Sequence, residues 1–275
     1  MAAVAGEPEV IRDKAAMRAW ARRRRAEGKT VALVPTMGFL HDGHLSLVSA
    51  AAAASATGPV AVVVSIYVNP SQFAPTEDLA TYPSDLAGDL RKLAATGAVA
   101  AVFCPPDLYV RAGAGGSGGA VSCLEEASCG DGHETWIRVE RLEKGLCGSR
   151  RPVFFRGVAT VVAKLFNIVE PDIAVFGKKD YQQWRVICRM VRDLDFAIDI
   201  IGSEIVREAD GLAMSSRNVH LSHEEREKIV EQENLVALER IDRPAAICVA
   251  AWFGKVRLID NMEIQTHHPD GGASI

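Results

Sequence analysis

Apolar runs and amphipathic segments alternate along most of the chain. Five runs that are rich in β-branched residues or apolar on both faces indicate buried strands: 30–36, 60–68, 98–105, 172–177 and 197–208. Segments with apolar residues at helical spacing lie between and before them: 10–27, 45–56, 85–95, 155–171 and 180–194. This alternation, with right-handed crossovers, predicts an α/β fold with a doubly wound, Rossmann-like parallel sheet.

The length and the charge of the chain limit its organisation and its partners. At 275 residues it is long enough for two units, and we expect a Rossmann-like domain over 1–205 and a small α+β C-terminal domain over 206–275. The 31 basic and 35 acidic side chains give a net charge of -4, which indicates neither nucleic acid nor a membrane surface as a partner. The basic run from Arg22 to Arg25 ends a predicted helix, where positive charge complements the dipole and faces water.

Cysteine usage and hydropathy favour a cytoplasmic protein. The six cysteines form no CxxC pair, so neither a zinc ribbon nor a thioredoxin-type site is expected. No signal peptide precedes Glu7, and we expect reduced thiols. The uncharged stretch 45–68 is nominally long enough to span a bilayer, but Gly58 and Pro59 break it, and a helix followed by a strand explains it better. The glycine-rich segment 112–120 is expected to be a surface insertion without chemistry.

Polar motifs follow three of the predicted strands. They are the stretch after Val34, VNPSQF at 68–73 and GKKDYQQ at 177–183. Ligands of doubly wound sheets bind beyond the carboxyl ends of the strands. We therefore expect these three motifs to form one site.

Two histidines, His41 and His44, lie where a helix is expected to begin, in VPTMGFLHDGHLSLV. Zinc would need a third ligand, and no companion cluster lies nearby in the sequence. A general base would leave the second imidazole unexplained, and a pair of capping or mutually bonded surface histidines is a structural alternative. A helix N-terminus attracts anions, however, and two imidazoles that donate there can hold phosphate oxygens. Gly38 and Gly43 would let a polyphosphate approach the backbone.

Further groups suited to phosphate binding follow along the chain. GKKDYQQ contains Lys178 and Lys179 at a strand end, and DGLAMSSRN contains Ser215, Ser216 and Arg217 on a predicted loop. Each motif is weak alone, because a lysine at a strand end is often solvated and a Ser-Ser-Arg turn often caps a helix. Their joint occurrence with HxGH favours a nucleotide site.

Four stretches together resemble the signature motifs of the pantothenate synthetase (pantoate-beta-alanine ligase) family, within the HxGH nucleotidyltransferase superfamily. They are VPTMGFLHDGHLSLV, VSIYVNPSQF, FGKKDYQQ and READGLAMSSRN. The amino-acid sequence of 149–184 is most similar to that of plant members. The resemblance implies an ATP-dependent ligase, usually homodimeric. Pantoate attacks the α-phosphate of ATP to give pantoyl adenylate and pyrophosphate, and β-alanine then attacks the activated carbonyl to give pantothenate and AMP.

The resemblance also implies roles for individual residues. The expected ATP contacts are Thr36, Met37, Gly38, His41, His44, Gly177, Lys179, Asp180, Val206, Met214, Ser215, Ser216 and Arg217. The expected catalytic groups among these are His41, His44, Lys179, Ser215, Ser216 and Arg217. Pantoate is expected to contact Met37, Gln72 and Gln183. Asp89 corresponds to an acidic residue near a magnesium (Mg²⁺) ion, although Gly88 stands where some members have its acidic neighbour.

The chain departs from the family pattern after Lys228. Several tens of residues of a long helical stretch are absent before the closing strands, so the C-terminal domain, which is the lid over ATP in the family, is expected to be truncated. A working ligase is the first hypothesis. The second is a catalytically impaired isoform that binds ATP or dimerises with full-length subunits. The third is another HxGH nucleotidyltransferase, in which Gln72 and Gln183 would have no role.

Overall fold

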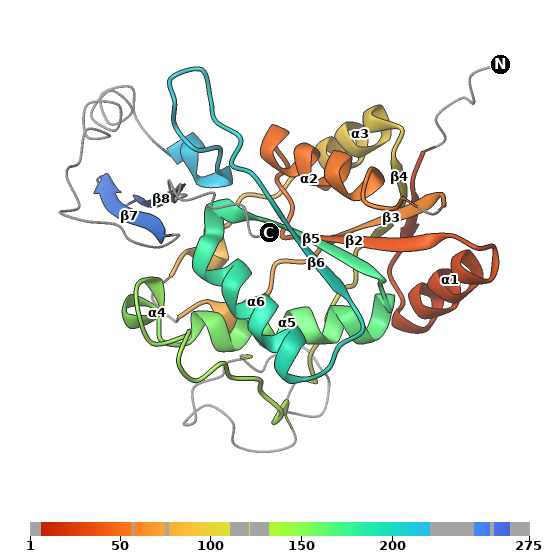
Figure 1. Cartoon of the computed structure of the whole chain (residues 1–275), viewed down its shortest axis with the longest axis horizontal. Helices are drawn as coiled ribbons and strands as arrows, with labels where there is room; N and C mark the ends of the chain where they lie inside the picture. Colours follow the sequence, from red (N-terminus) through yellow and green to blue (C-terminus); the bar gives the residue numbers. More distant parts are fainter. Residues whose placement is uncertain are drawn as a thin grey trace, which may run out of the picture.

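A six-stranded parallel sheet forms the centre of the protein, and a two-stranded antiparallel hairpin stands beside it (Figure 1). The structure is a computed structural model, and it describes residues 7–56, 58–74, 77–110, 121, 132–220, 245–253 and 256–264. The strands are β1 (Glu9–Ile11), β2 (Thr30–Thr36), β3 (Val60–Ile66), β4 (Val99–Phe103), β5 (Ile173–Gly177), β6 (Asp199–Ser203), β7 (Ala245–Phe253) and β8 (Val256–Ile264). The helices are α1 (Lys14–Ala26), α2 (Asp42–Ala52), α3 (Leu86–Thr96), α4 (Cys147–Arg150), α5 (Phe154–Val169) and α6 (Tyr181–Asp193). Short 3-10 turns are η1 (Pro70–Gln72), η2 (Asp78–Thr81), η4 (Lys178–Asp180) and η5 (Ser216–His220).

The strand order is β1-β4-β3-β2-β5-β6, and every pair in this sheet is parallel. The chain progresses outward from β2 through β3 to β4, then returns to the other side of β2 with β5 and β6. This reversal confirms the predicted doubly wound topology. It also creates a switch point between the carboxyl ends of β2 and β5, where such sheets bind ligands.

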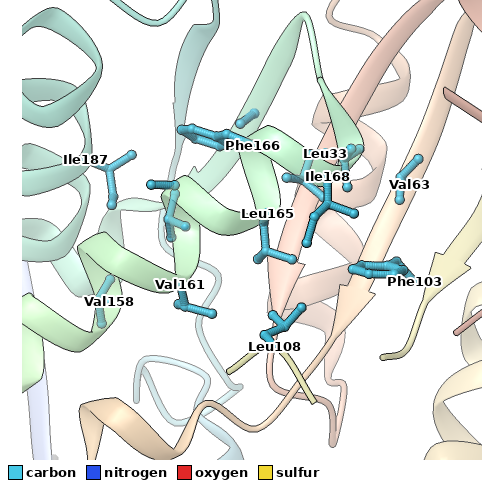
Figure 2. Packing of buried hydrophobic residues seen from close by; sticks show 14 of the residues in the cluster. Leu33, Val63, Phe103, Leu108, Val158, Val161, Leu165, Phe166, Ile168 and Ile187 are labelled. Atoms are coloured by element: carbon cyan, nitrogen blue, oxygen red, sulfur yellow. The ribbon is translucent and has the colours of Figure 1, made fainter. Parts of the chain in front are cut away.

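Helices cover both faces of the sheet. Alternate residues of β2 point to opposite sides, so Val31 and Leu33 pack with α1, α5 and α6, while Ala32 and Val34 pack with α2 and α3. Figure 2 shows the first layer, in which Leu165 and Ile168 of α5 meet strand side chains such as Phe103. Burial on both faces explains why these strands read as continuous apolar runs. None of the helices among the described residues combines the length and the apolar character that a membrane span requires.

Several element boundaries differ from the predictions; the strand predicted over 197–208, for example, is limited to Asp199–Ser203. Two of the differences concern the starts of helices. Val10 and Ile11 belong to β1, which pairs with β4, and α1 begins only after Asp13, whose side chain accepts the Ala16 N–H at 2.8 Å. The helix expected from residue 45 begins at Asp42, so both histidines belong to its first turn. The glycine-rich segment 112–120 and the junction at Lys228 lie outside the described residues.

The basic end of α1 faces water at Arg22 and Arg23, as predicted, but its arginines also form ion pairs. Arg22 donates to both oxygens of Glu170, at 3.1 and 2.7 Å, and Arg25 donates to Asp172. Asp172 also accepts the Val31 N–H at 2.7 Å, which joins the loop before β5 to β2. These ion pairs fasten α1 to the end of α5 and to the start of the central strands.

A close backbone approach fixes α5 against η1, the turn that carries Gln72. At Gly157 of α5 a Cβ atom would lie 2.5 Å from the Ser71 carbonyl oxygen and 2.6 Å from the Gln72 nitrogen. These neighbours are backbone atoms, so they can give way only if the turn moves. Gly157 is therefore needed for packing, in spite of the cost of a glycine inside a helix.

We expect Gly157→Ala to lower the free energy of unfolding by about 1–3 kcal/mol, because overpacking outweighs the gain in helix propensity. Urea denaturation measures this change. Gly145→Ala is the matched control, since its Cβ would have nothing within 4 Å. A Gly157→Ala protein as stable as the control would contradict the close approach.

Candidate active site

A cavity of about 260 Å³ opens at the carboxyl ends of β2, β3 and β5, at the switch point of the sheet. We call it the main cavity. It brings together nearly all of the residues that the sequence nominated: Thr36, Met37, His41, His44, Gln72, Gly177, Lys179, Asp180, Gln183, Val206, Met214, Ser215, Ser216 and Arg217. Gly38 and Asp89, which were also nominated, are not among its lining residues.

The two histidines form the start of α2. His41 is the N-cap residue, and its carbonyl accepts the His44 N–H at 2.8 Å. In return, the His41 N–H donates to Nδ1 of His44 at 3.3 Å, and the ring centroids are 4.1 Å apart. A neutral His44 whose Nδ1 accepts must carry its proton on Nε2. His44 is thus prepared to donate an N–H from that atom.

Both imidazoles are neutral at physiological pH. Burial, together with the Lys179 ammonium, lowers the pKa of His41 to about 4. Burial, the neighbouring His41 ring and Lys179 lower the pKa of His44 to about 3. Nδ1 of His41 is buried and has no hydrogen-bond partner among the described residues. The arrangement therefore suits donation to an anion better than proton abstraction near neutral pH.

Asp89 holds the turn that leads into α2. Its two carboxylate oxygens accept the N–H groups of Phe39, at 2.8 Å, and of Leu40, at 2.7 Å. Phe39 has a left-handed φ of 52°, which a non-glycine residue adopts at an energetic cost. Gly38 also has a positive φ of 85°, and a Cβ there would lie 3.1 Å from Asp89 Oδ2. This buried carboxylate stabilises an otherwise unfavourable backbone.

These contacts do not fit the expected magnesium site. Asp89 is 1% exposed, and both of its oxygens already accept backbone N–H groups. Among the described residues, no group of three or more His, Cys, Asp or Glu side chains is arranged to hold a metal. Mg²⁺ requires near-octahedral oxygen ligation and keeps several waters, which a carboxylate enclosed in this way does not offer.

Gln72 is oriented by a buried polar network. Asn69 Nδ2 donates to Gln72 Oε1 at 3.0 Å, so the Gln72 amide turns its NH₂ group toward Met37, whose Sδ lies 3.3 Å away. Tyr109 in turn donates to Asn69 Oδ1 at 2.9 Å. The network presents a donor to the main cavity. The sequence motif VNPSQF contains Asn69 but suggested no role for it, and no sequence signal pointed to Tyr109.

The Ser-Ser-Arg loop is tied to η2. Arg217 donates to both oxygens of Asp78, at 3.1 and 3.2 Å, and its guanidinium lies over the Tyr82 ring. Ser216 Oγ is 3.3 Å from the Tyr82 hydroxyl. These contacts keep the loop at the mouth of the main cavity. Asp78 was not predicted, because a single carboxylate in a polar loop carries no pattern.

The two lysines of GKKDYQQ point to different partners. Lys178 pairs with Glu204 at 2.6 Å and with Glu263 of β8 at 2.7 Å, and it does not line the main cavity. Lys179 does line it, and among the described residues its nearest carboxylate oxygen, on Asp180, is 3.9 Å away. Lys178 is therefore a structural residue, and Lys179 is the available cation.

The hairpin reaches the main cavity, because Arg257, Leu258 and Ile259 of β8 line it. Asn261 fastens the strand to η4 by donating to the carbonyl oxygens of Lys178 and Lys179, both at 2.8 Å. A pair of bonds from Arg207 to Asp260, at 2.6 and 3.0 Å, holds it further. The site thus includes residues from beyond the segment 221–244. The sequence indicated the hairpin strands but assigned none of these residues to the site.

Known proteins are similar to this chain over most of its length. The sequence profile of the family described as Pantoate-beta-alanine ligase matches residues 9–233. The Pantoate-beta-alanine ligase of Oryza sativa subsp. japonica is 71% identical over 308 positions, with 94% of this chain and 98% of that protein covered. The corresponding protein of Arabidopsis thaliana is 56% identical, with the same coverage of each chain.

Solved structures are similar too. The pantothenate synthetase of Thermus thermophilus has a TM-score of 0.75 and 36% identity, and the match covers 94% of this chain and all of that one. The pantoate-beta-alanine ligase of Francisella tularensis, complexed with beta-gamma ATP and beta-alanine, has a TM-score of 0.72 and 31% identity, and the match covers 93% and 97% of the two chains.

The alignments also show that some positions of the relatives are absent from this chain. The rice alignment includes 94% of the 275 residues, about 259, so roughly 50 of its 308 positions have no counterpart in this chain. The match to the Desulfatibacillum aliphaticivorans protein spans 226 positions and 82% of the chain, about 226 residues, which leaves no net gap in that part. The number of absent positions is of the size expected for the departure after Lys228.

The family match extends over most of the chain and includes each of the four motifs. It removes the third hypothesis, that of another HxGH nucleotidyltransferase. The plant relatives match over nearly their whole length. The chain therefore belongs to the pantoate-beta-alanine ligase family.

Proposed function

We propose that this chain is an ATP-dependent ligase that condenses pantoate with β-alanine to pantothenate through a pantoyl-adenylate intermediate. A pantoate carboxylate oxygen attacks the α-phosphorus of ATP and pyrophosphate leaves. The amine of β-alanine then attacks the acyl carbon, the bond from that carbon to the AMP oxygen breaks, and the amine loses a proton to solvent. The observation that supports this most is one cavity that combines His41, His44, Lys179 and the Ser-Ser-Arg loop with Gln72 and Gln183.

The phosphates of ATP bind at the side of the main cavity that carries His41 and His44. The start of α2 provides unpaired N–H groups and the positive end of a dipole, and His44 adds a neutral donor on Nε2. Lys179 and Arg217 add positive charge. These groups can stabilise the charge that develops on the leaving pyrophosphate, which is where a preorganised donor accelerates the reaction.

Pantoate suits the opposite side of the cavity. Gln72 and Gln183 supply amide groups for its hydroxyl and carboxylate oxygens, and Met37 lies between the two substrates. Val158, Val161 and Leu165 of α5 add an apolar wall beside them. Two methyl groups on the central carbon of pantoate match such a wall.

The impaired isoform remains the alternative function, because roughly 50 aligned positions are absent. Lid elements complete active sites and exclude water, so their loss can slow turnover without abolishing ATP binding. The retained hairpin favours the working enzyme, since Arg257, Leu258 and Ile259 still line the main cavity. Pyrophosphate release separates the two functions, because it reports the first chemical step.

The same proposal includes the domain division, the oligomeric state, the compartment and the metal ion. We place its ATP- and pantoate-binding unit in 1–205 and a truncated lid in 206–275, and the resemblance supports a homodimer. The free thiols Cys104, Cys147 and Cys188 are compatible with the cytoplasm. Mg²⁺ would accompany the triphosphate of ATP, since this ion is commonly held mainly by substrate phosphates and water.

We expect His44→Ala to slow pyrophosphate release from pantoate and Mg-ATP by about 100- to 1,000-fold, with a smaller effect on ATP affinity, because a transition-state donor is lost. A coupled pyrophosphate assay measures both. Ser49→Ala, at an exposed position of the same helix, is the control. No pyrophosphate release by the unmutated chain would favour the impaired isoform, and a change in ATP affinity alone would make His44 a ground-state contact.

The neutral imidazoles also predict a pH dependence of stability. The unfolded chain protonates each histidine near pH 6.5, whereas folded His41 and His44 remain neutral to about pH 4 and 3, so the free energy of unfolding falls as the pH drops below 6.5. Between pH 6.5 and 5 we expect the unmutated chain to lose about 1–2 kcal/mol more than His44→Gln does. Urea denaturation at several pH values measures this, and equal losses would contradict a buried neutral His44.

Asp89→Asn distinguishes the structural role of this carboxylate from metal binding. The amide replaces one of the two accepting oxygens with an NH₂ donor that faces a backbone N–H, so we expect the turn to shift and kcat for pyrophosphate release to fall by about 10- to 100-fold. The Mg²⁺ concentration that gives half-maximal rate should stay unchanged. A markedly higher Mg²⁺ requirement with little loss of kcat at saturating Mg²⁺ would restore Asp89 as a metal ligand.

A further inference from the structure

The cations near the main cavity differ in how their charge is balanced. Arg151 donates to both oxygens of Glu77, at 2.6 and 2.8 Å, and Arg217 does the same to Asp78. Arg257 has no such partner: among the described residues, no carboxylate oxygen lies within ion-pair distance of its guanidinium. Its two terminal nitrogens instead lie 3.5 Å from Cys147 Sγ.

Arg257 also lines a second, smaller cavity of about 60 Å³, which we call the side cavity. Its lining residues include Cys147, Lys179, Asp180, Gln183, Arg257 and Asp260. Lys179, Gln183 and Arg257 line both cavities, so the two adjoin. Gln183 is the residue expected to hold pantoate, and the side cavity therefore lies next to the acyl group that the second substrate must reach.

The acidic residues of the side cavity leave Arg257 available. Asp260 accepts two bonds from Arg207 and one from the Asn261 N–H, which is 2.7 Å away. Within the part of the chain that the structure describes, the cation nearest to Asp180 is Lys179, at 3.9 Å. A guanidinium that is half-buried and lacks a carboxylate loses solvation without an ion pair in return, so an anionic ligand would stabilise it.

The position of Arg257 is set by the rest of β8. Asn261 binds the carbonyl oxygens of Lys178 and Lys179, and Asp260 binds Arg207. In the backbone register of the hairpin, Arg257 lies opposite Trp252 of β7. These contacts fix the backbone of β8 and place the Arg257 guanidinium next to the segment that carries Lys179. Arg257 is therefore held in position, as a ligand-binding residue must be.

We propose that Arg257 binds the carboxylate of the amino-acid substrate, a short ω-amino acid, and holds it in the side cavity. This inference rests on the proposed function. Pantoate loses its carboxylate charge on adenylation. The phosphates of ATP already have partners, which are His41, His44, Lys179 and Arg217. The carboxylate of the second substrate is therefore the anion left without an assigned partner. It keeps its charge throughout the reaction. A cation beside Gln183 would hold it while the amine at the other end of the molecule attacks.

The test compares two amines that differ only in this charge: β-alanine and β-alaninamide. The unmutated chain should strongly prefer β-alanine. We expect Arg257→Gln to raise the KM for β-alanine by about 10- to 100-fold, as for a lost hydrogen bond to a charged group, and to erase the preference over β-alaninamide. Arg257→Lys should restore part of it. Single-turnover pyrophosphate release from pantoate and Mg-ATP, measured without any amine, should change by less than about twofold in these variants.

Lys178→Gln is the matched control, because it removes an equal charge and loosens the hairpin through Glu263, and neither Lys178 nor Glu263 lines either cavity. An equal loss of preference in this variant would show that hairpin position, and not the Arg257 charge, matters. Unchanged discrimination in Arg257→Gln would overturn the proposal, and so would a raised KM for ATP in pyrophosphate release, which would assign Arg257 to the phosphates. Failure of the unmutated chain to release pyrophosphate would instead count against the proposed function.

Discussion

A buried carboxylate at the turn between β2 and α2 is the interaction on which the site depends. Asp89 accepts two backbone N–H groups from this turn and thereby stabilises the left-handed Phe39. The turn places His41 as the N-cap of α2, and the histidines then lock each other through a backbone-to-ring bond. Without that fixed turn the helix N-terminus and the His44 donor would not face the same point, and preorganised donors act only when they are held in place.

The second constraint is close packing between the helix layer and the substrate side of the cavity. Gly157 lets α5 contact the backbone of η1, and the Gly157 carbonyl accepts from Asn69 at 3.2 Å. Asn69 in turn fixes the Gln72 amide. The same helix places Phe166 and Ile168 in the core layer of Figure 2, so core packing and substrate recognition share one rigid element. The predicted effects of Gly157→Ala therefore concern stability first and the orientation of Gln72 as its consequence.

Sequence patterns predicted what depends on local periodicity. The strand 30–36 and the helix α5 appear where the apolar patterns placed them, and the four motifs meet at one switch point. The short edge strand β1 was missed, because its three residues continue the apolar spacing of the next helix and only pairing with β4 distinguishes them. The role of Asp89 was missed for a similar reason: an acidic residue in an amphipathic helix looks the same whether it faces water, a metal or a backbone turn. Arg257 belongs to this class as well, since only the folded chain reveals which cations have carboxylate partners.

The retained hairpin explains how a shortened C-terminal region can still contribute to the site. β8 pairs with β7, and among the described residues outside the hairpin its side-chain contacts come from Cys147, Lys178, Lys179 and Arg207, all of which precede Lys228. The position of β8 and the exclusion of water from the main cavity therefore depend on different parts of the chain. Anchoring of β8 keeps Arg257 beside Gln183, whereas exclusion of water depends on whatever else covers the cavity. Adenylation relies mainly on groups that precede Lys228, and amide formation requires that the adenylate survive until the amine arrives. A shortened lid should consequently expose the intermediate to hydrolysis before it impairs phosphate binding, so the ratio of AMP to pantothenate is the quantity most sensitive to the missing segment.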